Sequence, residues 1–181
     1  MSHGRISAPQ PEAFEVGAEV LRNGGNAVDA AIACALTQTV VDPQMWGIAG
    51  FGNIQLYLPK LGVHTTFDFH GRSPLATRAD MWEHLLEHEA LDGWGFILKG
   101  RVNEFGYGAI TTPRTLATFE EVLQRFGSKS IADLLQPAIA YAVDGFKARP
   151  HMSHFWNMPP TAGRDANITM VNKLPATRKI Y

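Results

Sequence analysis

The sequence holds 181 residues, of which 45% are hydrophobic and 18% charged, enough for one domain with a buried core. Its 16 Lys and Arg nearly balance its 17 Asp and Glu, so no strongly basic surface points to a nucleic-acid partner. The longest apolar stretch, residues 27–41, is interrupted by polar side chains and is shorter than the ~20 residues of a membrane span. We therefore expect neither nucleic acid nor a membrane as a partner.

Cysteine usage and the N-terminal residues bear on the cellular compartment. Cys34 is the only cysteine, so the sequence cannot form an internal disulfide, and on an apolar helix it reads as inert core filler. Residues 1–5 show no apolar signal segment. Both features favour the cytoplasm, which is the expected location. Ser2 would become an N-terminal nucleophile if Met1 were removed, but Pro9 and Pro11 stand where such an enzyme needs a strand.

The first third of the chain predicts two helices and a hairpin. Apolar residues from Phe14 to Leu21 share one helical face, and the Gly-rich run 23–26 ends that helix. Residues 27–40 are apolar on nearly all sides, which is typical of a helix buried between layers. Residues 53–58 and 63–69 alternate as strands around a turn at 59–62, so they predict a β-hairpin.

The remaining chain predicts mostly helices. We expect an irregular stretch over 71–108 with a short helix at 81–88. A helix capped by Thr112 follows, with a stripe of Leu116, Phe119, Leu123 and Phe126. Residues 131–135 predict a short turn and 137–144 a separate helix, and no regular pattern follows Arg149. Because a lone hairpin is only marginally stable, further strands are expected from elsewhere, giving an α+β sandwich with one incomplete layer.

Three segments resemble the γ-glutamyltransferase family, in the same order and at similar spacing. Residues 17–31 read GAEVLRNGGNAVDAA, close to that family's G-x-E-V-L-R-x-G-G-N-A-V-D-A-A. Residues 41–52 and 135–146 are similar to its V-E-P … G-I-G-G-G-G-F and Q-P-A … A-x-D-G-F patterns. The resemblance covers roughly residues 5–150. It implies a four-layer αββα fold of the N-terminal-nucleophile hydrolase type, of which residues 1–181 are the N-terminal portion of one domain.

The resemblance also implies a division of the chemistry between two subunits. A precursor is cleaved, and the catalytic threonine becomes the N-terminus of the small subunit, where its own α-amine acts as the base. No cofactor is implied. No threonine of this chain has the matching context, because Thr65 and Thr66 lie in a predicted strand and Thr111 and Thr112 precede a helix. We therefore expect no catalytic residue in this chain and a C-terminal small subunit, or the remainder of the precursor, as its partner.

The predicted substrate site departs from the family pattern. Residues 68–74 read DFHGRSP, whereas the transpeptidases show D-x-R-E-x-A-P, in which the arginine binds the α-carboxylate of the substrate. His70 takes the place of that arginine, and Arg72 follows two residues later, on the same face of an extended strand. His70 and Arg72 are therefore the predicted substrate-binding residues, with Arg72 as the anion clamp.

Other candidate residues have structural interpretations that compete with functional ones. A hydrogen-bonding role is favoured over a substrate contact for Asp29, and a helix-to-strand connection is favoured over ligand wrapping for Gly47–Gly52. His84 with His88, and His151 with His154, have spacings that can hold a metal, but no third ligand is evident and no metal is expected. The loop around Trp82, Trp94, Phe96 and Tyr107, which also carries Lys99, Arg101 and Asn103, can be a lid, a substrate-selecting wall or a packing surface.

Three functions remain open at the level of sequence. The first is a γ-glutamyltransferase-like amidohydrolase that transfers or hydrolyses a γ-glutamyl or related acyl group of a small-molecule amide. The second is an acylase of the same superfamily that cleaves a non-glutamyl amide. The third is a non-catalytic binding or assembly subunit.

Overall fold

The computed structural model describes residues 4–161 and 163–180, so Ser2 lies outside the described residues. The chain forms two compact units. Unit 1 comprises Met1–Gly71 with Pro113–Ala148, and unit 2 comprises Arg72–Thr112 with Arg149–Tyr181. Each unit combines helices with a two-stranded sheet, as expected for the α+β class. The assignment of residues 1–181 to one domain stays a prediction.

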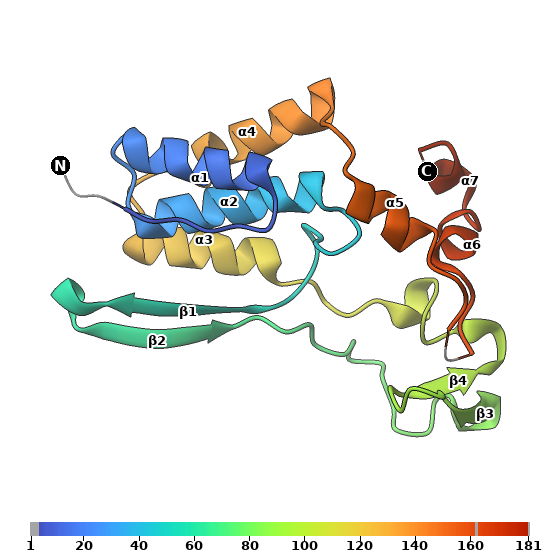
Figure 1. Cartoon of the computed structure of the whole chain (residues 1–181). Coiled ribbons are helices and arrows are strands. Elements are labelled where there is room, and N and C mark those ends of the chain that lie inside the picture. Colours follow the sequence, from blue (N-terminus) through green and yellow to red (C-terminus); the bar gives the residue numbers. More distant parts are fainter. Residues whose placement is uncertain (1–3, 162, 181) are drawn as a thin grey trace. The chain divides into compact units, whose positions relative to one another are not determined.

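Four helices make up most of unit 1, and the first two agree with the sequence analysis. Proline at the first position starts α1, and Asn26 caps α2 by accepting hydrogen bonds from the backbone N–H groups of Val28 and Asp29. The Asp29 carboxylate accepts in return from the Asn26 N–H, which completes a capping box. The helices are α1 (Pro11–Arg22), α2 (Ala27–Val41), α3 (Thr115–Phe126) and α4 (Ile131–Asp144) (Figure 1).

The predicted hairpin of unit 1 is confirmed. Strands β1 (Asn53–Leu58) and β2 (Val63–Asp68) pair antiparallel, with Asn53 opposite Asp68 at the open end. Gly62 closes the turn in the left-handed conformation at φ 66°, which other residues adopt only with strain. Alternate side chains such as Ile54 and Phe67 pack against the helices, while the other face of the hairpin is exposed.

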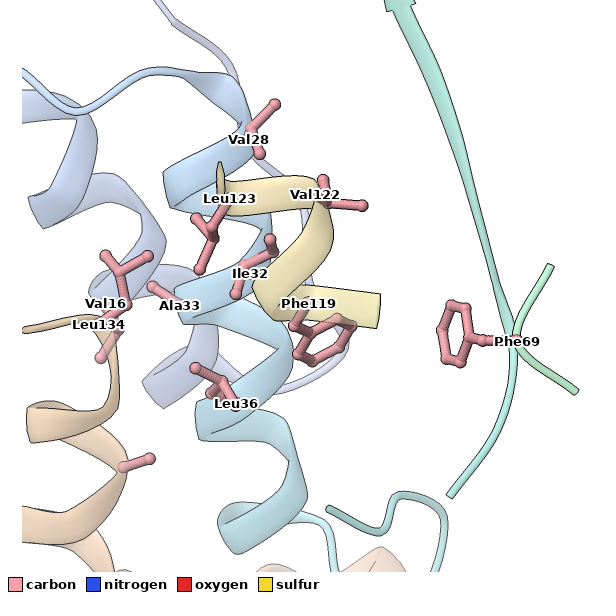
Figure 2. Packing of buried hydrophobic residues seen from close by; sticks show 11 residues of the cluster. Val16, Val28, Ile32, Ala33, Leu36, Phe69, Phe119, Val122, Leu123 and Leu134 are labelled. Atoms are coloured by element: carbon pink, nitrogen blue, oxygen red, sulfur yellow. The ribbon is translucent and has the colours of Figure 1, made fainter. Parts of the chain in front are cut away.

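The core of unit 1 surrounds α2, which explains why this helix has no polar face. Its residues Val28, Ile32 and Leu36 are at most 4% exposed. They lie close to α3, and Phe69, directly after β2, points toward Phe119 of α3 in Figure 2. The two rings meet edge to face with centroids 6.0 Å apart. This contact fixes the end of β2 against the helices and thereby positions the residues that follow.

Two predicted helix boundaries in unit 1 are wrong. Helix α3 begins at Thr115 with Arg114 as the preceding cap position, rather than after Thr112. The Thr112 N–H donates instead to the carbonyl oxygen of Arg72 at 2.9 Å in an isolated β-bridge, which keeps this residue extended. Phe119 and Leu123 of the predicted stripe are buried, Val122 joins them, and Leu116 is 41% exposed.

The predicted break at Pro137 is also wrong. Helix α4 runs without interruption from Ile131 to Asp144, with Pro137 inside it. Leu134 and Ala138, on either side of the proline, are both 3% exposed in the shared core. Proline usually ends or kinks a helix, but burial of the turns on both sides of Pro137 keeps α4 continuous.

Unit 2 contains a second hairpin that the sequence analysis missed. The predicted helix at 81–88 is wrong: it is reduced to a 3₁₀ turn at Glu83–Leu85, followed by β3 (Leu86–Glu89). Strand β3 pairs antiparallel with β4 (Phe96–Leu98), and Gly93 and Gly95 take positive φ in the connection. Pairing between segments ten residues apart thus overrides the local helical pattern.

The stretch after Arg149 is more regular than its composition indicates. It forms three short helices, α5 (Pro150–Trp156), α6 (Asn167–Val171) and α7 (Pro175–Arg178). Proline opens the first and last of these. Across the described parts of both units, none of the helices has the length and apolar character that crossing a bilayer demands.

Candidate substrate site

The end of β2 presents a carboxylate–imidazole pair. Asp68 Oδ1 accepts a hydrogen bond from the His70 backbone N–H at 3.1 Å and lies 2.6 Å from His70 Nδ1. Two residues of separation suit this geometry, because an aspartate at the start of a turn readily bonds the backbone two residues on. Both side chains are exposed. The pair is therefore accessible from solvent.

The electrostatics of this pair favour an ionised carboxylate. The hydrogen bond from the His70 side chain, reinforced by the His70 backbone N–H, lowers the pKa of Asp68 below its ordinary value. The charge of Arg114 acts in the same direction more weakly. Asp68 can therefore hold the His70 ring in one orientation through Nδ1, which leaves Nε2 outside this contact.

A pocket in unit 1 begins beside this pair. The ring of Phe51 lies against that of His70, with centroids 5.4 Å apart. Phe51 also lines a pocket of about 390 Å³ between the loop after α2, the starts of β1 and α3, and the core. The residues that line it are Ala35, Thr39, Met45, Trp46, Gly47, Gly50, Phe51, Gly52, Asn53, Phe69, Thr115 and Phe119.

The Gly-rich segment is the helix-to-strand connection that the sequence analysis favours, and its glycines also line the pocket; ligand wrapping stays a prediction. It connects α2 to β1, and the Gly50 N–H donates to the Gly47 carbonyl at 3.0 Å in a tight turn. A Cβ atom on Gly50 would lie 2.9 Å from that same carbonyl oxygen, so only glycine fits there. The favoured interpretation as a connection agrees with this turn, and the same glycines also open the wall of a pocket.

Arg72 falls on the other side of the boundary between the two units. His70 lies in the first segment of unit 1, which ends at Gly71, whereas Arg72 begins unit 2. The Arg72 backbone is fixed by the bridge to Thr112, and its side chain is exposed. Among the described residues, no hydrogen bond or ion pair engages its guanidinium. The role of Arg72 as an anion clamp, and that of His70 in substrate binding, stay predictions.

The contacts of the other candidates from the sequence analysis indicate structural roles or leave them without a ligand set. Asp29 is fully buried and accepts four hydrogen bonds from Asn26, Ser128 and Lys129, which supports the structural interpretation. Cys34 is buried, and burial raises the pKa of its thiol. No group of three or more metal-ligating side chains occurs within residues 4–161 and 163–180. His84 and His88 do not share a helix face, because a 3₁₀ turn and a strand hold them.

The aromatic loop of unit 2 lines a pocket of its own. Trp82, Phe96 and Asn103 are among the residues around a space of about 650 Å³. Trp94 and Tyr107 are instead 81% and 96% exposed. Some of the loop residues thus line a pocket and others lie on an open surface. Whether the loop selects a substrate or packs against another surface is not decided by this arrangement.

Two features of the site were missed by sequence reasoning. Phe51 reaches His70 through the closure of the hairpin, and Arg114 acts on Asp68 from the residue before α3. Neither relation has a local sequence signal, because each joins segments brought together only by folding. The aromatic residue at the end of the Gly-rich run was the one visible hint.

Comparison with known proteins places these features in a family. The family profile described as Gamma-glutamyltranspeptidase matches residues 13–181. An acylase ACY 1 proenzyme of Pseudomonas sp. (strain V22) is 37% identical over 84% of this chain and 27% of its own length. A glutathione hydrolase proenzyme of Pseudomonas sp. (strain A14) is 36% identical over 80% of this chain and 23% of its own length. The chain thus spans about a quarter of these curated relatives.

A solved structure extends the likeness to the fold. The gamma-glutamyltranspeptidase of Helicobacter pylori superposes with a TM-score of 0.77 and 26% identity, over 99% of this chain and 47% of the other. This likeness confirms the predicted α+β fold of the four-layer N-terminal-nucleophile hydrolase type, of which the chain holds a part. With the profile matching nearly its whole length, the chain belongs to the gamma-glutamyltranspeptidase family.

Proposed function

We propose that this chain is the substrate-binding part of an amidohydrolase or acyltransferase whose nucleophile lies elsewhere in the complete protein. The observation that carries the proposal is the family profile over residues 13–181, which includes the Asp68–His70 pair at the end of β2. The two curated relatives are named proenzymes, which supports a chain that works together with a second segment.

The proposed reaction is acyl transfer through a threonine of that second segment. Its hydroxyl attacks the carbonyl carbon of the amide, its α-amine takes the hydroxyl proton, and the C–N bond breaks as the amine leaves with that proton. Water or an acceptor amine then releases the acyl group from the ester. A γ-glutamyl donor requires a cation for its α-carboxylate, and Arg72 is the residue of this chain proposed for that role.

A second candidate, an acylase that acts on a non-glutamyl amide, is favoured by one specific observation. The carboxylate-binding arginine of the family pattern is replaced by His70, whose Nδ1 is already engaged by Asp68. An imidazole paired with a carboxylate attracts a substrate anion far less than a free guanidinium does. The acylase relative, at 37% identity, supports this candidate.

The two candidates are separated by a substrate panel on the protein expressed from its natural gene. γ-Glutamyl-p-nitroanilide and plain acyl anilides are compared, and mass spectrometry checks for a cleaved chain that starts with threonine. If the donor is γ-glutamyl, Arg72→Ala should raise KM by an amount equivalent to about 2–5 kcal/mol of binding. Arg125→Ala, in an exposed ion pair with Glu121 on α3, is the matched control and should change little.

Each outcome of this experiment leads to a different conclusion. An unchanged KM and kcat for a γ-glutamyl donor in Arg72→Ala removes Arg72 from the site. Turnover of acyl anilides alone selects the acylase. If no amide in the panel is cleaved and no second segment carries an N-terminal threonine, the enzymatic proposal is wrong and a binding or assembly role remains.

A further inference from the structure

We propose that the pocket lined by Phe51 binds an uncharged, apolar acyl chain of the substrate. The inference rests on the acylase form of the proposed function and names the acyl group that it selects. The pocket lies wholly within unit 1, and its volume of about 390 Å³ falls in the range of small-molecule sites.

The chemistry of the lining selects against charge. None of the described residues that line this pocket is Asp, Glu, Lys, Arg or His. Phe69 and Phe119, which line it, are each 5% exposed, and its polar side chains Thr39, Asn53 and Thr115 are all uncharged. A carboxylate or ammonium group placed there would lose its hydration without gaining a counter-charge, which is strongly unfavourable. An alkyl or aromatic chain would instead exchange water for apolar contact.

The rim of the pocket consists of large apolar side chains exposed to water. Met45, Trp46 and Phe51 are 65%, 47% and 66% exposed, and all three lie within one seven-residue loop. Clustered exposure of this kind marks a binding surface in a folded protein. A chain that enters the pocket would cover part of these side chains.

Glycine positions keep the pocket open. A Cβ atom on Gly47 would meet no other atom within 4 Å, although Gly47 lines the pocket. The packing of the loop therefore does not require glycine at position 47. Position 50 differs, because a side chain on Gly50 would collide with the backbone. We therefore expect the loop to accept a larger residue at Gly47, and a side chain there to reduce the pocket that Gly47 lines.

The position of the pocket connects it to the proposed substrate pair. Phe51 lines the pocket and also lies against His70, whose Nδ1 is bound to Asp68. A chain held against Phe51 therefore ends next to the residue that occupies the place of the family's carboxylate-binding arginine. Apolar contact here would take the place of the bidentate ionic contact that the arginine of the family pattern makes.

Direct binding is measured first, on the protein expressed from its natural gene and without any need for turnover. Hexanamide should change the tryptophan fluorescence of the wild type in a saturable way, and this change should be absent in Trp46→Phe. The monoamide of adipic acid, which carries a carboxylate at the far end of a similar chain, should bind at least tenfold more weakly. Equal binding of the two amides would contradict an uncharged chain.

Kinetics then locate the chain in the reaction. Across acetyl, butyryl and hexanoyl anilides, kcat/KM should rise about fourfold for each added methylene, the equivalent of about 0.8 kcal/mol. Gly47→Ala should shorten the preferred chain and Gly47→Leu should abolish the dependence on length. Ala117→Leu, which adds the same side chain on the exposed face of α3, is the control. Thermal unfolding of each variant checks that the fold is retained.

The experiments distinguish a failure of the pocket proposal from a failure of the proposed function. Saturable binding of hexanamide without any amide cleavage would retain the pocket and reject the proposed function. Cleavage that is independent of chain length and unaffected by Gly47→Leu would retain the function and overturn the pocket. Absence of hexanamide binding in the natural protein would also overturn the inference, because another segment then fills the space.

Discussion

Asp29 lies at the start of α2, and its carboxylate links this helix to the loop after α3, where Ser128 lies 99 residues further along the sequence. Its Oδ1 accepts from the backbone N–H groups of Ser128 and Lys129 at 2.8 and 3.1 Å. Its Oδ2 accepts from the Asn26 N–H at 2.8 Å and from the Ser128 hydroxyl at 2.6 Å. One buried side chain thus satisfies the first turn of α2 and the loop between α3 and α4.

Removal of this carboxylate should destabilise unit 1. Asp29→Ala leaves three backbone N–H groups and a hydroxyl without their acceptor, so we expect a loss of about 3–5 kcal/mol in the free energy of unfolding. Asp29→Asn keeps the shape and one acceptor oxygen and should lose less. Urea denaturation followed by circular dichroism measures both. Equal stability of Asp29→Ala and wild type would show that water replaces the carboxylate.

The pH dependence of stability gives a second readout on the same variants. Burial alone would raise the pKa of Asp29, but hydrogen bonds from Ser128, Asn26 and Lys129 outweigh it and lower the pKa below its ordinary value. The folded state thus binds this proton more weakly than the unfolded state, so the stabilisation is full above the unfolded pKa of about 3.9. It is lost as pH falls through the folded pKa. Stability should therefore decline more steeply below pH ~4 in the wild type than in Asp29→Asn.

At the scale of elements, local patterns predicted α1, α2 and the β1–β2 hairpin well. Each of these has its signals within its own residues: proline or Asn26 at a helix start, and alternation around Gly62 in the hairpin. The misses depend on distant partners. β3 forms because β4 pairs with it, and α3 starts late because Thr112 is bound to Arg72. The candidate site follows the same rule. The local motif at residues 68–74 identified His70, but the contact of His70 with Phe51 joins distant segments and could not be predicted from the sequence.

Pro137 within α4 offers a test of how packing overrides local preference. Its ring lacks the N–H that would bond the carbonyl of the residue four positions earlier, a defect that costs up to about 3 kcal/mol in a helix interior. Pro137→Ala should therefore raise the free energy of unfolding by about 1–3 kcal/mol. Pro11→Ala is the matched control, because Pro11 opens α1, where the N–H has no helical partner. That variant should lose about 0.5 kcal/mol through the greater freedom of its unfolded chain.

Chemical denaturation of the two proline variants provides the comparison. A gain for Pro137→Ala with a small loss for Pro11→Ala agrees with a continuous α4 held together by the burial of Leu134 and Ala138. A loss in both variants would instead indicate that α4 is bent at Pro137 in a way that the surrounding core requires.

At the scale of the whole molecule, the hairpin of unit 1 stands without a neighbouring strand. Among residues 4–161 and 163–180, no third strand pairs with β1 or β2, so each presents one edge of unpaired backbone groups. Its outer face carries Asn53, Gln55 and Thr66, which are exposed. Two strands alone are marginally stable, and open edges invite pairing. The chain also corresponds to 47% of the Helicobacter pylori transpeptidase chain that it superposes on.

These open edges predict a difference in hydrogen exchange between the 181-residue chain and the protein expressed from its natural gene. In the short chain, the edge amides of β1 and β2 should exchange far faster than those of the buried helix α2. If the natural protein carries the second segment of the proposed function, strands from that segment should pair with these edges and slow their exchange at least tenfold, while α2 changes little. Identical exchange at the hairpin edges in both samples would mean that the remaining polypeptide leaves this sheet uncovered. The nucleophile of the proposed function would then have to reach the proposed site at His70 without a shared sheet, which is the most direct way for two segments of one fold to hold their side chains in a fixed register.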